Sequence, residues 1–571
     1  MLVYGDRSET RAPRPCLDEL AGRLAGVAAL PPGLGRHSAL VGALILAGRL
    51  AQSVADADFA AARADHEGEA SAALGMLVQS LAESVLRSWE SGFAAAPLPE
   101  IPRPRGLPPA ADMRLPEGYA FYAVYPEAFA EAARRLRLAG PPRVIGIRSI
   151  GTSLAAIVAA ALGAPSPATL RPFGDPFDRQ VALAPALAAD LLALPDAHYV
   201  IVDEGPGLSG SSFGAVAAWL EGRGVPAERI AFVTSHDGPP GPQASRANRE
   251  RWQRTQRVAG EFGERLPRLV AAWAADLLGP LDGPLADLSG GAWRCLHCAD
   301  ESLWPAACAA QERRKLLARA RGRTWLIKFA GLGAIATHKL ARARALHAAG
   351  FAPEPRGLIH GFLVERWHGE ARLGGPELPP LGRVALYLGA RARLFPATPG
   401  SGAGLAELLE MCRRNIGLHL GAAAAARLDR WERQLPSLAP RPRLVETDNR
   451  LDRHEWLRLP DGRWLKADAL DHHQAHDLVG CQDPAWDVAG AWTEFPLRGR
   501  RAAAVAAATG AAAGRRIDPG LLRFFAIAYP AFRLGQAVLA ASGEAPAEAA
   551  RLRAKAESYA RALEHRLHSS R

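Results

Sequence analysis

The chain has 571 residues, of which 49% are apolar and 22% are charged, and its formal net charge is +11. That length is too great for one ordinary domain, and the apolar content is ample for several buried cores. The six cysteines are too few and too scattered for a disulfide scaffold, and the basic residues are spread along the chain. The sequence therefore favours a multidomain enzyme that handles small anionic substrates, and nucleic acid is not an expected partner.

The first 95 residues are predicted to be helical, because residues 17–93 repeat apolar side chains at helical spacing. We expect this region to be a cap or an oligomerisation element, since no residue pattern in it indicates chemistry. Residues 1–15 carry charges and no apolar core, so no signal peptide is expected. No run of about 18 uncharged apolar residues follows, so we predict no membrane span and a cytoplasmic location.

Proline- and glycine-rich stretches divide the rest of the chain. Prolines throughout residues 96–118 predict an extended connector, and residues 119–240 alternate strands with helices. Residues 241–292 are predicted to be a polar, basic linker with one helix, and residues 293–571 to be a further domain. Because the basic, Gly- and Pro-rich stretch at about 238–291 separates two patterns of periodicity, we expect the two halves to fold independently.

A short cysteine motif leaves two interpretations open. Cys295 and Cys298 have the CxxC spacing, with His297 between them and Cys308 nearby. These residues suit part of a zinc site, but a second ligand pair at suitable spacing is missing. Reduced thiols in the cytosol are therefore the favoured interpretation.

The most informative stretch runs from His198 to Gly224. Residues 199–202 are predicted to be a buried parallel strand, and Asp203 and Glu204 follow it directly. A loop rich in Gly and Ser then leads into a helix, and such a loop presents backbone N–H groups and the positive helix end to a phosphate. The loop also fits G-x-G-x-x-G, which is a weak signal by itself, and an ordinary tight turn between strand and helix stays an alternative.

Two further segments suit anions. The turn before the helix at 152–162 contains four residues of the right kind, namely Arg148, Ser149, Gly151 and Thr152. Between this turn and the acidic pair, a Gly- and Pro-rich segment carries Arg171 and Arg179. This segment is either a mobile basic flap or a rigid turn whose arginines face water.

These motifs together resemble the type I phosphoribosyltransferases over residues 119–240. The resemblance implies a doubly wound parallel sheet and phosphoribosyl pyrophosphate with Mg²⁺ as substrate. It also implies that Asp203 and Glu204 hold the ribose hydroxyls, that Arg148 and its turn contact the pyrophosphate, and that Arg171 and Arg179 cover it. The 5-phosphate would be held by the loop residues Gly207, Ser209, Gly210, Ser211 and Ser212. The loop is one residue longer than is usual in that family.

The C-terminal part has a second set of motifs. Lys328 lies in a predicted apolar strand, and it is one of only five lysines among 69 basic residues. A helix and further strands follow, and much later Asp448 precedes a hairpin that ends at Asp468. Two carboxylates on either side of a hairpin suit a base and a metal ligand.

This order resembles the aminoglycoside phosphotransferase-like branch of the protein-kinase fold. The resemblance implies that Lys328 binds the phosphates of ATP, that Asp448 is the catalytic base and that Asp468 holds Mg²⁺. His454 stands where the branch has an asparagine metal ligand, and Asp452 is an alternative base. No glutamate follows Lys328 in the next helix, and no Gly-rich phosphate loop precedes it.

We therefore expect an α/β multidomain protein with a helical N-terminal region, a phosphoribosyltransferase-like domain and an α+β kinase-like C-terminal domain. The predicted function is a bifunctional transferase, in which phosphoribosyl transfer is coupled to ATP-dependent phosphorylation of a small molecule. The alternative is a catalytically silent sensor that binds phosphoribosyl pyrophosphate or ATP and regulates a partner. The acceptor and the oligomeric state do not follow from the sequence.

Overall fold

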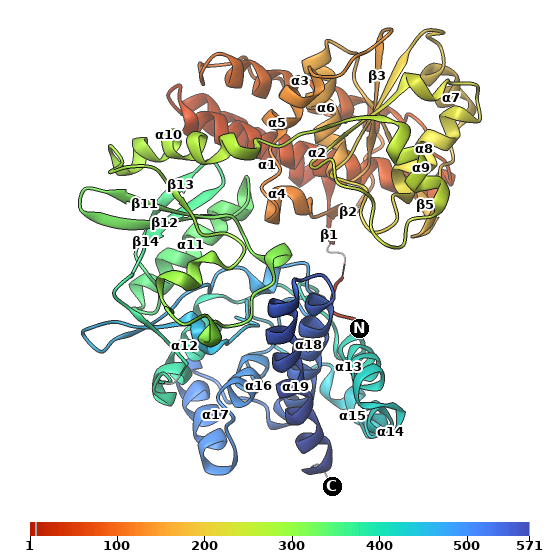
Figure 1. The fold of residues 1–571 in the computed structure, drawn as a ribbon. Helices are drawn as coiled ribbons and strands as arrows, with labels where there is room; N and C mark the ends of the chain where they lie inside the picture. The colour runs from red at the N-terminus through yellow and green to blue at the C-terminus, as the bar shows by residue number, and fades with distance from the viewer. Residues whose placement is uncertain (6–7, 376, 570–571) are drawn as a thin grey trace.

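The computed structural model of the chain describes residues 1–5, 8–375 and 377–569. Figure 1 shows the N-terminal helices and a parallel sheet in the upper half, a small antiparallel sheet at one side, and a group of helices below. The N-terminal elements form the first layer: β1 (Ser8–Arg11), α1 (Pro13–Ala29), α2 (Leu34–Ala62), α3 (Glu69–Glu90) and β2 (Ala111–Arg114). The strand β1 pairs antiparallel with β2, so part of the proline-rich connector is tied to the N-terminus.

A parallel sheet with strand order β4-β3-β7-β8-β9 forms the centre of the upper half, and β7 is its middle strand. Alternate residues of β7 face opposite sides: Val200 and Val202 pack with the N-terminal helices and α6, and Ile201 packs with α8. The sheet is therefore covered by helices on both faces. Its elements are α4 (Glu117–Phe121), α5 (Pro126–Ala133), β3 (Pro142–Ile147), α6 (Gly151–Leu162), β4 (Ala168–Leu170), β5 (Phe173–Asp175), β6 (Asp178–Gln180), α7 (Pro185–Leu191), β7 (His198–Val202), α8 (Ser211–Glu221), η1 (Ala227–Arg229), β8 (Ile230–Thr234), α9 (Arg246–Arg254) and β9 (Gln256–Ala259).

The parallel sheet continues beyond the boundary expected at residue 240. The strand β9 pairs with β8, although the sequence around it is polar and basic. Trp252 of α9 is buried against Phe213 and Phe232, and this contact holds the segment on the sheet. A single buried aromatic side chain thus decides the packing of a stretch whose average composition is that of a surface loop.

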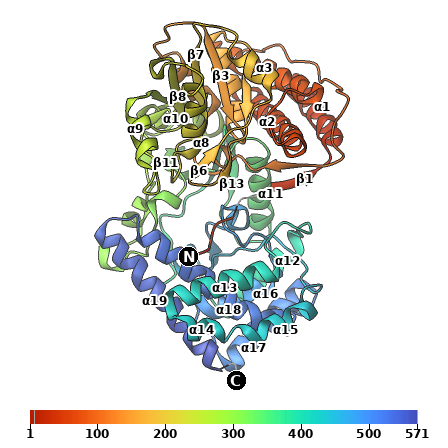
Figure 2. The same cartoon turned by 90° about the vertical axis from the view of Figure 1, so that its right-hand side faces the viewer.

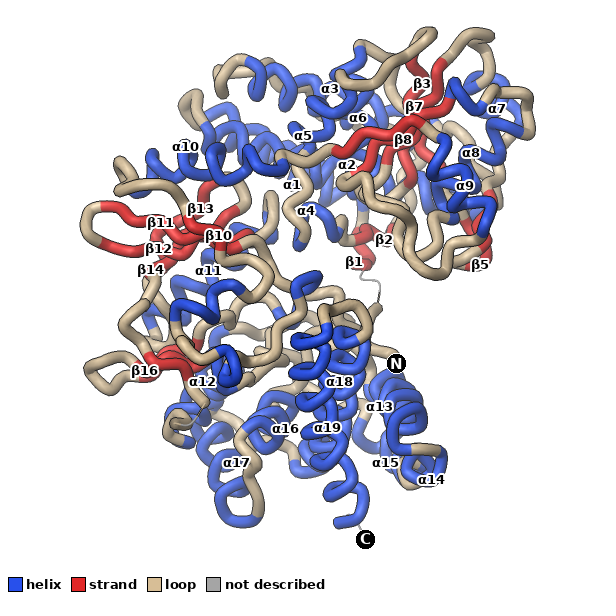
Figure 3. The backbone as a smooth tube through the Cα atoms, in the orientation of Figure 1, coloured by secondary structure: helices blue, strands red, loops and turns tan. Residues whose placement is uncertain are grey.

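The small antiparallel sheet, with strand order β10-β11-β12-β14-β13, begins the C-terminal half. Figure 3 shows its strands, in red, well apart from the parallel sheet, and Figure 2 shows α11 between the upper half and the C-terminal helices. The segment leading into it and the sheet itself consist of η2 (Gly263–Arg265), α10 (Leu266–Leu278), β10 (Ala286–Asp287), η3 (Ala292–Leu296), η4 (Glu301–Leu303), η5 (Ala309–Gln311), β11 (Lys315–Ala320), β12 (Arg323–Phe329), α11 (Ala334–Ala348), β13 (Pro355–Ile359) and β14 (Phe362–Arg366).

The remaining chain forms a helical lobe around a short three-stranded sheet of order β15-β16-β17. Its strands and helices are β15 (Arg372–Leu373), α12 (Leu381–Leu394), α13 (Leu405–Leu420), α14 (Ala422–Ala426), α15 (Asp429–Leu438), η6 (Arg453–Glu455), β16 (Trp456–Arg458), β17 (Trp464–Lys466), η7 (His472–Gln474), α16 (Ala485–Glu494), α17 (Gly499–Ala513), α18 (Pro519–Ala541) and α19 (Pro546–Ser569). The expected hairpin is therefore present as β16 and β17, with Asp468 just after it.

One hydrophobic core runs across the expected domain boundaries. It joins Leu44 of α2 and Val202 of β7 to Ile327 of the small sheet. Gly42 of α2 lies against Gly333 at the start of α11, where an added Cβ atom would be 3.1 Å from the Gly333 Cα atom. The small sheet thus buries one face against the N-terminal half, which argues against independent folding of the two halves on either side of residues 238–291.

Two helices, α2 and α18, are long and apolar enough to cross a membrane by length and composition alone. In this structure 83% of the apolar window of α2 and 89% of that of α18 are buried inside the protein. Both helices therefore have the packing of core helices, because their apolar surface is already covered by protein.

Candidate functional site

A cavity of about 970 Å³ lies between the small sheet and the helical lobe. All five lysines of the chain gather around it. Lys315, Lys328 and Lys555 line the cavity, and Lys339 and Lys466 each donate to an acid that lines it. In a chain that otherwise uses arginine, this gathering marks a place where a compact cationic head group is needed.

Lys328 and Asp468 meet in this cavity. The Lys328 ammonium donates to Asp468 Oδ1 from β12, the middle strand of the small sheet. Burial opposes the charge of Lys328, but Asp468 and Asp471 outweigh it and raise its pKa above the usual range. Burial likewise opposes the charge of Asp468, and Lys328 holds the pKa of this carboxyl far below its usual value. The pair is therefore ionised at neutral pH.

Three ligand-type side chains, from Glu455, Asp468 and His472, come within 4.8 Å of one another at the cavity wall. Glu455 Oε2 accepts a hydrogen bond of 2.6 Å from Lys466, and burial raises the pKa of Glu455 to about 7. The two carboxylates are the kind of oxygen ligand that Mg²⁺ prefers, and the imidazole is a softer third group. Asp468 and Glu455 therefore fit a magnesium ion in the place where the hairpin begins and ends.

His454, expected as a metal ligand, lies outside this group. Its ring stacks on Trp293 with centroids 5.7 Å apart, and burial lowers its pKa to about 4. The neighbouring side chain of Glu455 joins the group instead. His454 and Glu455 are adjacent residues just before β16, and their side chains point in different directions. The sequence does not show which of the two points toward Asp468.

Asp448 is close to the site but does not line the cavity. Its side chain is fully buried, accepts from the Tyr387 hydroxyl, and lies 3.4 Å from Lys466 Nζ. The backbone N–H groups of Asp448 and Asn449 donate to Asp487, which thus has a structural role. These contacts make Asp448 a residue that orders the loop behind the site.

Asp452, the alternative base, does line the cavity. It accepts hydrogen bonds from Arg533 at 2.8 Å and from Lys555 at 2.7 Å, so α18 and α19 both hold it. Burial opposes its charge, but Arg533 and Lys555 hold its pKa well below the usual value. Asp452 is therefore an ionised acid at the cavity wall.

The helix α11 offers a cation where the resemblance has an acid. Lys339 of α11 is buried and donates to Asp471 at 2.9 Å, and Asp471 follows the hairpin. Burial lowers the pKa of Lys339 to about 8 in spite of Asp471. An ion pair between Lys339 and Asp471 thus links α11 to the turn after the β16–β17 hairpin, and Lys328 takes no part in this pair.

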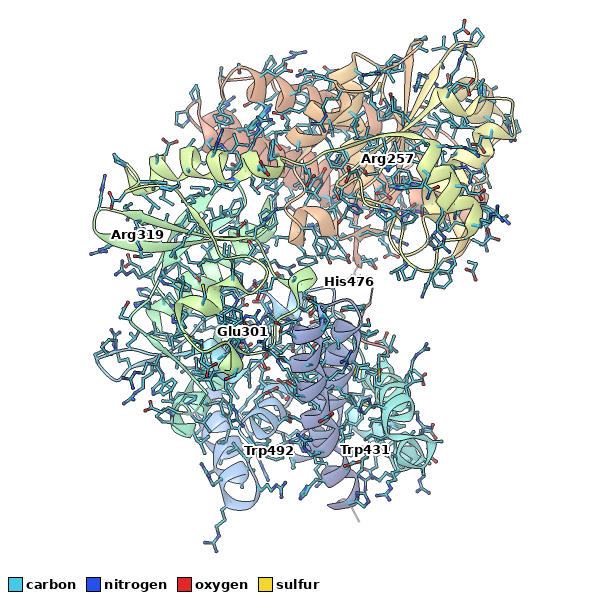
Figure 4. The ribbon with its side chains drawn as sticks, viewed as in Figure 1. Arg257, Glu301, Arg319, Trp431, His476 and Trp492 are labelled. Carbon is cyan, nitrogen blue, oxygen red and sulfur yellow. The ribbon has the colours of Figure 1, made fainter. Side chains whose placement is uncertain are left out.

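A strap formed by residues 292–311, which contains η3, η4 and η5, covers one side of the cavity. Trp293, His297 and Gln311 of the strap line the cavity wall. Glu548 of α19 anchors it, because its carboxylate accepts from Arg294 at 2.9 Å and from the Ala307 N–H at 2.7 Å. Glu301, labelled in Figure 4, lies in this strap and accepts from Arg551 at 2.9 Å.

A second cavity, of about 770 Å³, lies at the carboxyl end of β7 in the upper half. Asp203, Glu204, Gly207 and Ser149 line it. Burial raises the pKa of Asp203 to about 7, and burial together with Asp203 raises the pKa of Glu204 to about 8. Two acids that hold protons this strongly at the end of the middle strand suit a site for a cation or for sugar hydroxyls.

The arginines expected at this second cavity are paired elsewhere. Arg148 donates to Asp56 at 2.8 Å and to Asp65, and Arg171 donates to Asp56 at 2.7 Å. Both aspartates come from α2 or the turn after it, and neither arginine lines the cavity. Arg148 and Arg171 therefore join the helical N-terminal region to the sheet. The positive charge of Arg171 also opposes the rise that burial causes in the pKa of Asp203.

The Gly/Ser loop is in contact with the segment that carries Arg179, for which the sequence leaves a mobile flap and a rigid turn open. Ser209 and Ser211 both donate to the backbone carbonyl of Pro176, at 3.0 and 2.8 Å. Pro176 lies in the turn of the β5–β6 hairpin. Arg179 of this hairpin donates to the Pro172 carbonyl at 3.1 Å. Gly207 and Gly210 have positive φ angles, of 57° and 64°, which the turn into α8 requires. The hairpin therefore closes over the loop.

Three other residues that were expected to bind the substrate do not line the smaller cavity. Thr152 is buried, and its hydroxyl makes no hydrogen bond within the described residues. Gly151 has no room for a side chain, because an added Cβ atom would lie 2.7 Å from the Val202 carbonyl oxygen. Ser212 is in the first turn of α8 and does not line the cavity.

The two cavities are neighbours. Tyr122 lines both of them, and Arg314 lines the smaller one while Lys315 lines the larger one. His476 of the helical lobe bonds to Glu117, which lines the smaller cavity. Figure 4 shows His476 at the junction of the upper and lower halves.

Comparison with known protein families and with curated proteins found no match. Among solved structures, the chain is similar to choline kinase LicA from Streptococcus pneumoniae, with 14% identity over 54% of this chain and 100% of that chain and a TM-score of 0.36. It is also similar to a choline/ethanolamine kinase family protein from Mesorhizobium loti, with 16% identity, coverage of 53% and 97%, and a TM-score of 0.34. The chain is also similar to a spectinomycin phosphotransferase solved with ADP and spectinomycin, with 11% identity over 52% of this chain and 93% of that chain and a TM-score of 0.33.

Proposed function

We propose that the larger cavity binds ATP with Mg²⁺ and that the chain transfers the terminal phosphoryl group to a hydroxyl of a small molecule. The observation that carries this proposal is the convergence of Lys328, Asp468 and Glu455 in a cavity around which all five lysines gather. A volume of about 970 Å³ is at the upper end of the range for small-molecule sites, and has room for a nucleotide and an acceptor.

Four side chains at the cavity, those of Lys328, Asp468, Glu455 and Asp452, have a part in this reaction. Lys328 supplies a fixed positive charge for the phosphates, and Asp468 and Glu455 would hold Mg²⁺, which neutralises charge on the phosphates when it is bound. Asp452 accepts a hydrogen bond from the acceptor hydroxyl and takes its proton as the new P–O bond forms and the bond to ADP breaks. Positioning and charge stabilisation are the main contribution of the protein in such a transfer.

Titration calorimetry with ATP and Mg²⁺ tests the binding step. The wild-type protein should bind ATP below millimolar concentration, and Asp468→Asn should bind it at least about tenfold more weakly because a metal ligand is lost. Glu557→Gln, on the exposed side of α19, is the matched control and should bind as the wild type does. Equal affinity of all three proteins would contradict the assignment of the site.

A second candidate function belongs to the smaller cavity. Asp203 and Glu204 lie there at the end of the middle parallel strand and next to the Gly/Ser loop, which favours phosphoribosyl pyrophosphate with Mg²⁺ as the ligand. This ligand should raise the melting temperature of the wild-type protein. Replacing Asp203 by Asn and Glu204 by Gln together should abolish the rise, and an unchanged rise would exclude the assignment.

The shared wall at Tyr122 favours a link between the two activities, in which one site uses the substrate or product of the other. The alternative is a sensor that binds phosphoribosyl pyrophosphate or ATP without turnover. Release of pyrophosphate distinguishes the two, because phosphoribosyl transfer releases pyrophosphate and a sensor does not. Measuring pyrophosphate during incubation with candidate acceptors therefore separates an enzyme from a regulatory protein.

A further inference from the structure

Three side chains from three parts of the fold meet at a point away from both cavities. His37 comes from α2, Glu127 from α5, and His360 from the turn between β13 and β14. All three side chains are 0% exposed, and none of them lines either cavity. The cluster therefore lies where the N-terminal helices, the parallel-sheet domain and the small antiparallel sheet join.

The two imidazoles point the same nitrogen at one carboxylate. His37 Nε2 is 2.8 Å and His360 Nε2 is 3.2 Å from Glu127 Oε1. The other ring nitrogens are fixed by hydroxyl groups, because His37 Nδ1 bonds to Ser88 at 3.0 Å and His360 Nδ1 bonds to Ser38 at 2.9 Å. Histidine ligands of metal ions are held in this way, with the second nitrogen bonded to an outer group that sets the ring orientation.

Two buried polar atoms of this cluster, Glu127 Oε2 and His360 Nε2, make no hydrogen bond within the described residues. His360 Nε2 still faces Glu127 Oε1 at 3.2 Å, so Glu127 Oε2 is the atom that lacks any partner in the described part of the chain. The surrounding rings are apolar, since Trp89, Phe93 and Trp273 each contact one of the two histidines. Burying a carboxylate oxygen without a partner in such surroundings is costly, and a bound cation would remove that cost.

We propose that His37, Glu127 and His360 hold a structural zinc ion. The Nε2 atoms of the two histidines and one carboxylate oxygen of Glu127 give three donor atoms, and a water molecule would complete the four positions that zinc takes. Donor atoms around a tetrahedral zinc ion lie about 3.3 Å apart, so the observed 2.8 and 3.2 Å require only small outward movements. Two imidazoles select zinc over magnesium or calcium, which prefer oxygen ligands.

The position of the site explains what the ion does. It joins α2, α5 and the β13–β14 turn, three elements that are far apart in the sequence and share one core. The Tyr125 hydroxyl also donates to the His360 carbonyl at 3.0 Å, so the backbone of this turn is fixed as well. His360 has a φ angle of 36°, in the left-handed region that few residues other than glycine adopt. The ion thus fastens the small sheet to the N-terminal half.

Metal analysis of the purified full-length protein tests the site. The wild-type chain should contain about one zinc ion, and Glu127→Gln should lose it, because the amide keeps the size of the carboxylate but lacks its charge. The double variant Cys295→Ser, Cys298→Ser is the control, since these cysteines belong to no ligand group among the described residues. It should keep its zinc, and zinc that disappears with the cysteines but stays in Glu127→Gln would overturn the proposal.

A second measurement needs no variant. Removing the metal from the wild-type protein with a chelator should lower its melting temperature, and adding Zn²⁺ should restore it. Co²⁺ added to the metal-free protein should give the visible absorption of a four-coordinate site without a thiolate charge-transfer band. A protein that is isolated without zinc, takes up neither ion and melts unchanged would show that the three residues are only a hydrogen-bonded cluster.

Discussion

At the scale of single residues, the five lysines of the chain lie at or next to one cavity, each beside an acid. Of these, Lys328 can be picked out from the sequence because lysine is scarce in this chain. The sequence did not single out Glu455 and His472 as a pair, because only the folded hairpin and the turn after it bring them together. Arg148 and Arg171 had the right chemistry for an anion site, but their partners Asp56 and Asp65 are about a hundred residues away in the chain.

The acids Asp448 and Asp452 should respond differently to replacement. Asp448→Asn removes the charge that faces Lys466 inside the protein, so it should lower the free energy of unfolding by about 3 kcal/mol. Asp452→Asn should lower the rate of phosphoryl transfer by about 10²- to 10⁴-fold while ATP still binds, because only the proton acceptor changes. Urea unfolding and steady-state kinetics measure the two effects. A stable but inactive Asp448→Asn protein would restore Asp448 as the base.

Asp203 and Glu204 should make stability depend on pH. Their pKa values in the folded protein, about 7 and about 8, lie above those of unfolded chains, so the folded form binds their protons more tightly. The stability that they contribute is therefore lost as pH rises from about 4 to about 8. The double variant Asp203→Asn, Glu204→Gln should be more stable than the wild type by about 2–4 kcal/mol near pH 8.5, with a smaller gap near pH 4.5. Urea unfolding at the two pH values measures this, and a gap that does not change with pH would contradict the assigned pKa values.

At the scale of elements, the periodicity of the sequence predicted helices and strands with a regular apolar pattern, but not the segments that distant residues hold in place. The buried strand before Asp203, the hairpin before Asp468 and the helical N-terminal region are all present. The strand β9 was hidden because its sequence is polar, and the strap at 292–311 was hidden because it consists only of short 3₁₀ turns. Both depend on distant partners: Trp252 packs β9 and its helix onto the sheet, and Glu548 anchors the strap.

The strap should loosen when its anchor is removed. Glu548→Ala takes away the acceptor for Arg294 and for the Ala307 N–H, so hydrogen exchange of residues 293–311 should become faster. ATP should also enter and leave the larger cavity faster, because the strap forms part of the cavity wall. Hydrogen exchange followed by mass spectrometry measures the first effect, with Glu557→Gln as the control. Unchanged exchange in the strap would show that Glu548 is not its anchor.

At the scale of the whole molecule, the cores divide the chain differently from its composition. One core joins the N-terminal helices, the parallel sheet and the small antiparallel sheet, and a second lies mostly in the helical lobe but also contains Val3, Leu346 and Phe351. The basic, Gly- and Pro-rich stretch at 238–291 looked like a linker, yet it contains β9 and α10, which belong to the first core or its edge. Sequence composition reports local exposure, whereas a domain boundary depends on which surfaces bury one another.

Limited proteolysis should therefore give an unexpected boundary. The first cut between large fragments should fall between β14 and α12, where the chain passes from the first core to the second, and not within residues 238–291. Mass spectrometry of the early fragments identifies the cut. Early cleavage at 238–291 into two resistant halves would contradict the shared core.

The central claim, that the lysine-lined cavity transfers a phosphoryl group from ATP, is tested most directly by following the terminal phosphate. The protein is incubated with ATP labelled at that phosphate, Mg²⁺ and a panel of small hydroxylated molecules, and label transfer is measured by mass spectrometry. The wild-type protein and Glu557→Gln should phosphorylate at least one acceptor, and Asp468→Asn should not. ATP that binds in the cavity but never transfers its phosphate to any acceptor, or equal transfer by Asp468→Asn, would contradict the claim.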